Sequence, residues 1–366
     1  ENSPIKDIGR SYIVSSMLPA AFFITLGAFI YRAFIPETFT TPLVGDKYSA
    51  SLLLLYSALI MWVGFALYSM VNWIVRFYEG YYLFGWIKWI LVRLFCMPEY
   101  RRKTKFIKKV LDAKKKRVDG WEKVFEEYYN QAWSDYSDAE LSFPLREDDL
   151  MPTRLGNVLR ASEQYPEKYG LLAGISLWPR LSTLLPQNMA NQLEETNNHF
   201  IFLLNSSFLS YVNGLIGLLV LGICYIFQCC SVGIVSVNPL FGIHVPLSSL
   251  ISLFSKEEFL IVVFGWFLFG YILYLFSIPV AKTFGLLIRS SYDLYRFDLL
   301  KQLNYRIPRS LLQEKKDWVK ISDFVVTGGS LGSQPLDFKY NLRSEFTNNK
   351  RQSRNSRSRN SSKFNR

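Results

Sequence analysis

The sequence is poor in the residues that usually hold metals or form disulfides, with two histidines and four cysteines among 366 residues. His199 and His244 belong to no H-E-x-x-H or Cys/His pattern, so no zinc site is expected. The cysteines lack ligand spacing, and we interpret them as small apolar fillers near a membrane: Cys96, Cys224, Cys229 and Cys230. The sequence therefore predicts neither a metal site nor a bound cofactor.

Catalytic motifs are missing as well. The glycine-rich stretch 328–333 has no Lys-Ser/Thr after it and no strand before it, so it is typical of a flexible linker and not of a P-loop. No G-x-S-x-G motif occurs, and the Asp148-Asp149 pair is more typical of a turn or helix start than of a metal site. No catalytic residue is predicted, and the sequence leans towards a protein that is not an enzyme.

Charge is absent from the cores of four long apolar stretches. A membrane-spanning helix needs about 20 mainly apolar residues, and four stretches meet this requirement: 12–34, 51–74, 201–228 and 258–281. Arg32 and Lys282 stand near the ends, where long side chains can reach the headgroups. Because ion pathways and proton relays use charge inside the membrane, an ion-coupled carrier is disfavoured.

Proline and glycine inside the apolar stretches predict close packing between spans. Pro19 is tolerated in a spanning helix when a neighbouring helix bonds the carbonyl that it leaves free, so span one should pack against another span. Small residues allow helices to approach closely, within one chain or between chains of an oligomer. The candidate packing glycines are Gly214, Gly217, Gly222, Gly265 and Gly270.

Lysine and arginine in the flanking segments predict the orientation. The segments 35–50 and 229–257 hold one lysine each, whereas many lysines and arginines follow the second and the fourth span. Because loops on the cytoplasmic side carry the excess of Lys and Arg, both termini and the region 75–200 are expected to be cytoplasmic.

A basic block follows the second span. Residues 101–117 hold ten Lys/Arg against one Asp, a net charge of +9, within a predicted long helix over 101–133. Polybasic sequence next to a span is attracted to anionic lipid, so these residues are candidate lipid contacts: Arg101, Arg102, Lys103, Lys105, Lys108, Lys109, Lys114, Lys115, Lys116 and Arg117. A topology signal with a solvated face, or a protein or nucleic-acid partner, is the alternative.

Two further segments are apolar but cannot span. Residues 78–95 are aromatic-rich and shorter than a span, and Trp86 and Trp89 favour an interfacial amphipathic helix over a buried helix or a re-entrant segment. The stretch 154–186 should begin as a helix capped by Thr153 and must bury its apolar pieces against the bilayer, the long helix or another subunit. Trp178 is the candidate interface residue in this segment, and the polar anchors, expected to be structural, are Arg154, Arg160, Glu163 and Arg180.

Beyond the fourth span the sequence predicts helices over 285–303 and 310–325. Asp293 and Arg296 are three residues apart and would form a weak local pair. The tail from 328 to 366 lacks apolar residues to bury and is expected to be disordered. Its basic end, 343–366, is interpreted as a solvated or lipid-touching tether in preference to a nucleic-acid binder.

Two motifs carry a resemblance. The patterns GNVLRASEQYPEKYGL…LWPRL over 156–181 and SSYDLYRFDLLKQL over 290–303 resemble multi-pass bacterial membrane proteins of uncharacterised function. The resemblance implies a multi-pass protein of the bacterial plasma (inner) membrane. It implies no activity.

The sequence thus predicts an all-α, four-span integral membrane protein with a helical cytoplasmic domain and a disordered basic C-terminal tail. We expect it to hold that domain against the inner leaflet as a non-enzymatic interaction protein. An oligomeric channel or pore and an interfacial membrane enzyme are the alternatives. Expected partners are anionic lipid and a homo-oligomer or another protein. The expected segments are hairpins 1–77 and 201–285, an interfacial helix 78–98, cytoplasmic helices 99–200 and 286–327, and the tail 328–366.

Overall fold

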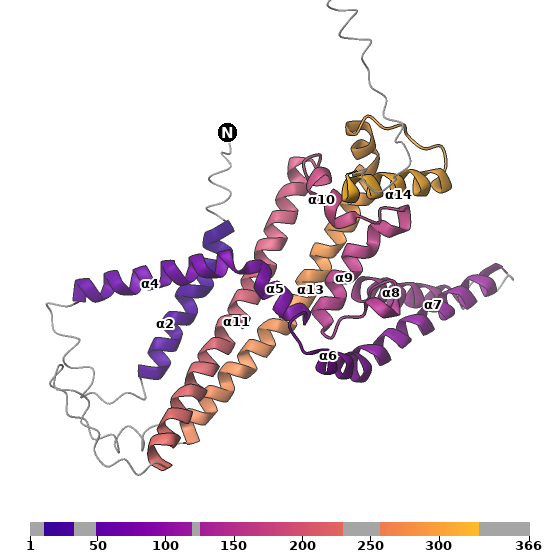
Figure 1. Cartoon of the computed structure of the whole chain (residues 1–366). Helices are drawn as coiled ribbons and strands as arrows, with labels where there is room; N and C mark the ends of the chain where they lie inside the picture. The colour runs from indigo at the N-terminus through magenta and orange to yellow at the C-terminus, as the bar shows by residue number, and fades with distance from the viewer. Residues whose placement is uncertain (1–10, 33–48, 119–124, 230–256, 329–366) are drawn as a thin grey trace, which may run out of the picture. The chain divides into compact units, whose positions relative to one another are not determined.

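The computed structural model describes residues 11–32, 49–118, 125–229 and 257–328, and all regular structure within them is helical (Figure 1). This part of the chain forms two compact units. Unit 1 contains residues up to 163 and 187–288, and unit 2 contains 164–186 and the residues from 289 onwards. The predicted disordered tail beyond 328 lies outside the described residues, as do Cys230 and His244.

Three helices of the described part are long and apolar enough to cross a membrane. The first covers 13–31 and joins the π-helix η1 (Ile13–Met17) to α2 (Leu18–Arg32). The others lie within α11 (Gln187–Cys229) and α13 (Glu257–Gln302). Three of the four predicted spans are therefore present as single apolar helices.

The predicted span over 51–74 is not one straight helix. It consists of α4 (Ser49–Ser69) and α5 (Val71–Glu79), which meet at an angle of 59° and count as a fourth span only if the bent pair is taken together. Helix α5 buries one face, including Ile74 and Tyr78, in the core of unit 1. The Tyr78 hydroxyl donates to Ser207 Oγ at 2.7 Å, so a hydrogen bond fastens α5 to α11 beyond the bend.

Helices α11 and α13 lie side by side and run antiparallel (Figure 1). The hydroxyls of Ser207 and Ser210 donate to the backbone carbonyls of Gly270 and Trp266, both at 2.7 Å. As the residue numbers of the donors rise along α11, the residue numbers of their partners on α13 fall, as expected for an antiparallel pair. Because antiparallel helices exchange ends, the polar start of α11 and the segment of α13 after residue 281 lie at the same end of the pair.

After α5 the chain forms short and long helices outside the apolar stretches. Helix α6 (Gly85–Leu91) and the π-helix η2 (Val92–Cys96) lead into α7 (Met97–Val118), which contacts α8 (Phe125–Ser142). The prediction of one helix over 101–133 is wrong, because two helices that pack against each other replace it. The sequence between them contains Asp119-Gly120, a dipeptide typical of turns.

Helix α9 (Arg154–Gln164) begins as predicted, since the Gly156 N–H donates to Thr153 Oγ1 at 3.0 Å. The buried Asn157 side chain bonds the backbone of Met151 through both its oxygen and its nitrogen, at 2.8 and 3.0 Å, and fixes the loop before the helix.

Ion pairs attach the α7–α8 pair to its neighbours. Lys282 of α13 lies 2.6 Å from Asp138 of α8.

Unit 2 is built from η4 (Tyr165–Tyr169), α10 (Gly174–Ser182), the last residues of α13 and α14 (Leu311–Thr327). Its core includes Trp318, Tyr292 and Leu177, all almost completely buried. Helix α14 begins where the sequence predicts, because Ser310 accepts a hydrogen bond from the Gln313 N–H. In the apolar stretch after Pro166, Leu171, Leu177 and Leu181 are buried in this unit, whereas Leu172 and Ile175 are exposed.

Candidate functional site: an aromatic cavity beside an ion pair

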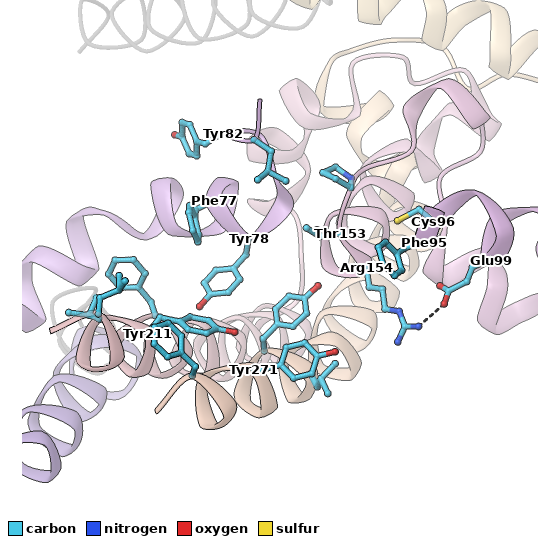
Figure 2. Close-up of a pocket in the computed structure, with 18 residues that line it drawn as sticks. Phe77, Tyr78, Tyr82, Phe95, Cys96, Glu99, Thr153, Arg154, Tyr211 and Tyr271 are labelled. Carbon is cyan, nitrogen blue, oxygen red and sulfur yellow. Dashed lines mark hydrogen bonds and ion pairs between the residues drawn. The ribbon is translucent and has the colours of Figure 1, made fainter. Parts of the chain in front are cut away.

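Unit 1 contains a cavity of about 760 Å³ between helices that are far apart in the sequence (Figure 2). Its walls come from α5 and the turn after it, η2, the starts of α7 and α9, and the facing sides of α11 and α13. Aromatic side chains make half of the lining: Phe77, Tyr78, Tyr82, Phe95, Phe208, Tyr211, Phe267, Tyr271 and Tyr274. The volume lies within the range of small-molecule sites.

Two glycines bring the end of α5 against the start of α9. Gly80 ends α5 with φ of +89°, a left-handed conformation that suits glycine, and a Cβ at this position would overlap Pro152. A Cβ on Gly156 would lie 2.8 Å from the carbonyl oxygen of Glu79. Side chains at either position would therefore push these elements apart and open one wall of the cavity.

Some tyrosines of the cavity are held by hydrogen bonds, and others are not. Tyr78 and Tyr274 stack with ring centroids 5.8 Å apart, Tyr78 donates to Ser207, and the Tyr274 hydroxyl accepts from the Leu155 N–H at 3.4 Å. Within the described residues, the hydroxyls of Tyr211 and Tyr271 form no hydrogen bond with protein. These two groups can therefore bond a ligand without losing a protein partner.

An ion pair lies at one end of the cavity. Arg154 of α9 lies 2.6 Å from Glu99 of α7, and the hydrogen bond to this carboxylate raises the pKa of the Arg154 guanidinium (Figure 2). Cys96 lies nearby with its side chain buried, and burial raises the pKa of its thiol. A deprotonated, nucleophilic thiolate is accordingly disfavoured at this position.

A second cavity of about 510 Å³ shares the ion pair with the first. Glu99, Arg154 and Leu275 line both cavities. In contrast to the aromatic cavity, the second is lined by six charged side chains: Glu99, Asp135, Asp138, Arg102, Arg154 and Lys282. The two cavities together present an apolar space and a charged space on either side of one ion pair.

Unit 2 holds a different polar cluster, centred on Asp293. Tyr165 donates to Asp293 Oδ2 at 2.7 Å, Tyr169 donates to Oδ1 at 2.6 Å, and Lys168 Nζ lies 3.3 Å from Oδ1. Burial, followed by the bond to Asp293, raises the pKa of Tyr165 and raises that of Tyr169 to about 12. The carboxylate accepts two hydrogen bonds and forms an ion pair, so the cluster connects η4 to α13.

The predicted side-chain pair of Asp293 and Arg296 is wrong. Arg296 Nε lies 2.7 Å from Glu314 Oε1 of α14, and its guanidinium stacks over the Tyr169 ring at 4.1 Å. With Asp293 it shares only a hydrogen bond to the backbone carbonyl. A partner 18 residues away replaces the neighbour on the same helix, because tertiary packing brings α14 against α13.

The predicted lipid-contact residues lie along α7. The side chains of Arg101, Arg102, Lys105, Lys108 and Lys109 are exposed. Lys103 and the four residues 114–117 belong to the same helix, but their side chains lie outside the described residues. The structure therefore places at least five cations on one solvent-accessible helix next to the two cavities.

The predicted interface tryptophans occupy two different environments. Trp86 and Trp89 of α6 are 66% and 61% exposed, with Arg93 stacked 5.3 Å above the Trp89 ring. Trp178 is half-buried in unit 2 and packs on Tyr292 with ring centroids 5.9 Å apart.

The predicted packing glycines also divide into two groups. A Cβ on Gly214 would lie 2.8 Å from Phe267, one on Gly217 2.6 Å from Val263, and one on Gly270 3.1 Å from Tyr211. Gly222 and Gly265 have no described atom within 4 Å of such a Cβ. Three of the five glycines therefore lie at the crossing of α11 and α13.

The predicted polar anchors of the central stretch each have a partner. Arg160 lies 3.2 Å from Asp149 and 3.3 Å from Glu163. Arg180 donates to the carbonyl of Ser176 in its own helix, and Arg154 pairs with Glu99. These contacts agree with a structural role and connect α9 to the short 3₁₀-helix η3 (Glu147–Asp149).

The aromatic cavity itself was not predicted from the sequence, because its lining comes from elements distributed between residues 77 and 275. Among the residues that the structure describes, no group of three His, Cys, Asp or Glu could hold a metal ion. Comparisons with family models, curated proteins and solved structures give no match. Function is therefore inferred from geometry.

Proposed function

We propose that the protein is a membrane-anchored, non-enzymatic interaction protein. The candidate spans would hold α7, α8, α9 and the helices of unit 2 at the cytoplasmic face of a bacterial plasma membrane. The exposed cations of α7 would contact the anionic inner leaflet, with each Lys or Arg near the surface contributing about 1 kcal/mol.

The antiparallel pairing of α11 and α13 carries this proposal. It places the polar beginning of α11 and the continuation of α13 after its apolar stretch at one end of the pair. Lys282 and Arg154, which pair with Asp138 of α8 and Glu99 of α7, attach the basic helix to that same end. The side with most Lys and Arg is the cytoplasmic side in membrane proteins, which supports the proposed orientation.

The polar side chains of unit 2 support an interaction role in preference to catalysis. Asp293 is bonded to two tyrosines, and Glu314 is paired with Arg296. The outer surface of the unit nevertheless carries large apolar residues, such as Leu312 at 68% exposure and Val326 at 65%. Exposed apolar surface of this kind is typical of sites that contact a protein or a membrane.

Labelling with a membrane-impermeant maleimide tests the anchoring. Cysteines placed at Lys115 and Asp298 in a chain without native cysteines should react in inside-out vesicles and not in intact spheroplasts. Labelling of the two positions from opposite sides would contradict the proposal.

Photo-crosslinking in intact cells tests the interaction role. A crosslinking residue at Leu312 of α14 should give discrete protein adducts, whereas one at Phe29 of α2, 75% exposed on a candidate span, should give mainly lipid adducts. Absence of protein adducts from Leu312 would contradict the interaction role. Ion flux through liposomes containing the purified protein, above that of empty liposomes, would favour a channel instead.

A further inference from the structure

The two cavities of unit 1 meet at the Arg154–Glu99 pair, and their chemistry changes abruptly there. On one side lie about 760 Å³ lined largely by aromatic rings, and on the other about 510 Å³ lined by charged side chains. Leu275 also lines both. A ligand that occupies both adjoining cavities must therefore have an apolar part and a charged part.

The aromatic cavity is bordered by the apolar parts of two candidate spans. Tyr211 belongs to α11 and Tyr271 to α13, both within helices that are long and apolar enough to cross a membrane. Tyr271 and Phe95 at the lining are 51% and 64% exposed. Tyr271 stands near the middle of the predicted span 258–281, at the depth of the hydrocarbon, so an apolar chain can enter the cavity from the bilayer.

The charged cavity has both signs in equal number, with three cations and three carboxylates. Two ion pairs use four of these groups, since Arg154 bonds Glu99 and Lys282 bonds Asp138. Arg102 and Asp135 form no ion pair with any other described residue. Arg102 and Asp135 therefore remain as one unpaired cation and one unpaired anion. They are complementary to a headgroup that carries a negative and a positive charge.

We propose that these two adjoining cavities bind a phospholipid with a phosphoethanolamine headgroup. One acyl chain lies in the aromatic cavity, the phosphate lies near Arg102 and near the Arg154 N–H groups that do not bond Glu99, and the primary ammonium lies near Asp135. Arginine suits phosphate because its guanidinium can donate two parallel hydrogen bonds, and an ammonium has three N–H donors for a carboxylate. This site is independent of the proposed interaction role.

Other common headgroups fit less well. The quaternary ammonium of a choline headgroup has no N–H and cannot donate a hydrogen bond to Asp135. A phosphoglycerol headgroup is anionic and brings no cation to that carboxylate. The other exposed cations of α7, Arg101, Lys105, Lys108 and Lys109, remain available for anionic lipid, so the two lipid contacts use different residues.

Native mass spectrometry of the full-length protein tests the selectivity. The protein is exchanged into micelles that contain equal amounts of phospholipids with phosphoethanolamine, phosphocholine and phosphoglycerol headgroups and identical acyl chains. We expect the phosphoethanolamine lipid to be retained about tenfold more than either competitor, the effect of one charge-assisted contact. Retention of all three in proportion to supply, or preference for another headgroup, would overturn the proposal.

Two substitutions assign the contacts, each with a matched control outside the cavities. Arg154→Gln should lower retention of the phosphoethanolamine lipid about tenfold, and Arg180→Gln, an exposed arginine of α10, should not. Asp135→Asn should abolish the preference over phosphocholine, and Asp323→Asn should preserve it. Wild-type selectivity in the Asp135 variant would overturn the ammonium site, and this readout stands even if Arg154→Gln fails to fold.

Discussion

The side-chain amide of Asn205 donates a hydrogen bond of 2.8 Å to the backbone carbonyl of Ser15. Four residues after Ser15, Pro19 has no N–H and cannot bond that oxygen in the α-helical register. Both Ser15 and Asn205 are buried, so water cannot take the place of the missing donor. Asn205 of α11 thus replaces the donor that proline removes, and the prediction that Pro19 requires a neighbouring span is confirmed.

Replacing Asn205 tests whether the helix that contains Pro19 depends on this hydrogen bond. Asn205→Leu is expected to lower the free energy of unfolding by about 1–3 kcal/mol, because the buried carbonyl of Ser15 loses its hydrogen bond from the Asn205 amide. Pro19→Ala supplies an N–H at position 19, so the same substitution should cost less in that background. Reversible unfolding in detergent should give a coupling of about 0.5–2 kcal/mol between the two positions.

Asn213 provides the control for this cycle. Its amide donates at 3.2 Å to the carbonyl of Phe23, an oxygen that Pro19 does not affect. Asn213→Leu should therefore cost the same with proline or alanine at position 19. Equal costs for Asn205→Leu in both backgrounds would show that Pro19 and Asn205 are not coupled.

The glycines of α11 offer a matched pair for measuring helix packing. Gly217→Ala would place a Cβ 2.6 Å from Val263 of α13, and the overlap should cost about 1–3 kcal/mol. Gly222→Ala meets no described atom within 4 Å and should be neutral, or stabilising by up to about 1 kcal/mol through helix propensity. Thermal unfolding in the same detergent compares the two, and similar effects would contradict the packing assignment.

The sequence predicts what depends on local chemistry. Thr153 and Ser310 cap their helices because a hydroxyl before a helix can bond the first free N–H groups. Three spans follow from the length of their apolar stretches. The bend between α4 and α5 does not follow from the sequence, because no glycine or proline marks the break at Met70.

Contacts between distant segments were the least predictable. The sequence paired Arg296 with Asp293 on the same helix, whereas Glu314 takes that place. The aromatic cavity, too, is formed by contacts between segments that are far apart in the sequence. Its tyrosines are visible in the sequence as a high aromatic content, but the sequence does not show that Tyr78 of α5 stacks on Tyr274 of α13.

Alkaline titration should report on Tyr169 of unit 2. Burial and the bond to Asp293 raise its pKa from 10.0 to about 12. A raised pKa means that folding favours the neutral phenol, so this contribution is complete below pH 10 and is lost as the pH rises towards 12. Tyrosinate absorbance is measured against pH together with helix content. Tyr169→Phe should remove the part of the absorbance change that occurs near pH 12.

The neighbouring carboxylate supplies the control for that titration. Asp293→Asn keeps the phenol of Tyr169 but removes the negative charge that opposes its ionisation, so the titration should move to lower pH. An unchanged titration in Asp293→Asn would mean that the carboxylate does not influence Tyr169.

Breaking the Arg296–Glu314 pair should destabilise unit 2 more than breaking any exposed pair. The side chains are 14% and 5% exposed, so Glu314→Gln leaves a nearly buried guanidinium without its counterion, at a cost of about 3–5 kcal/mol. Asp298→Asn, which breaks a pair with Lys301 whose side chains are 47% and 60% exposed, should cost at most about 1 kcal/mol. Amide hydrogen exchange in α14 measures both effects locally.

Replacing both partners by apolar residues, Arg296→Met with Glu314→Leu, should restore part of the protection, because the penalty comes from the unpaired charge. Equal protection of α14 in Glu314→Gln and Asp298→Asn would show that the buried pair contributes no more than the exposed one.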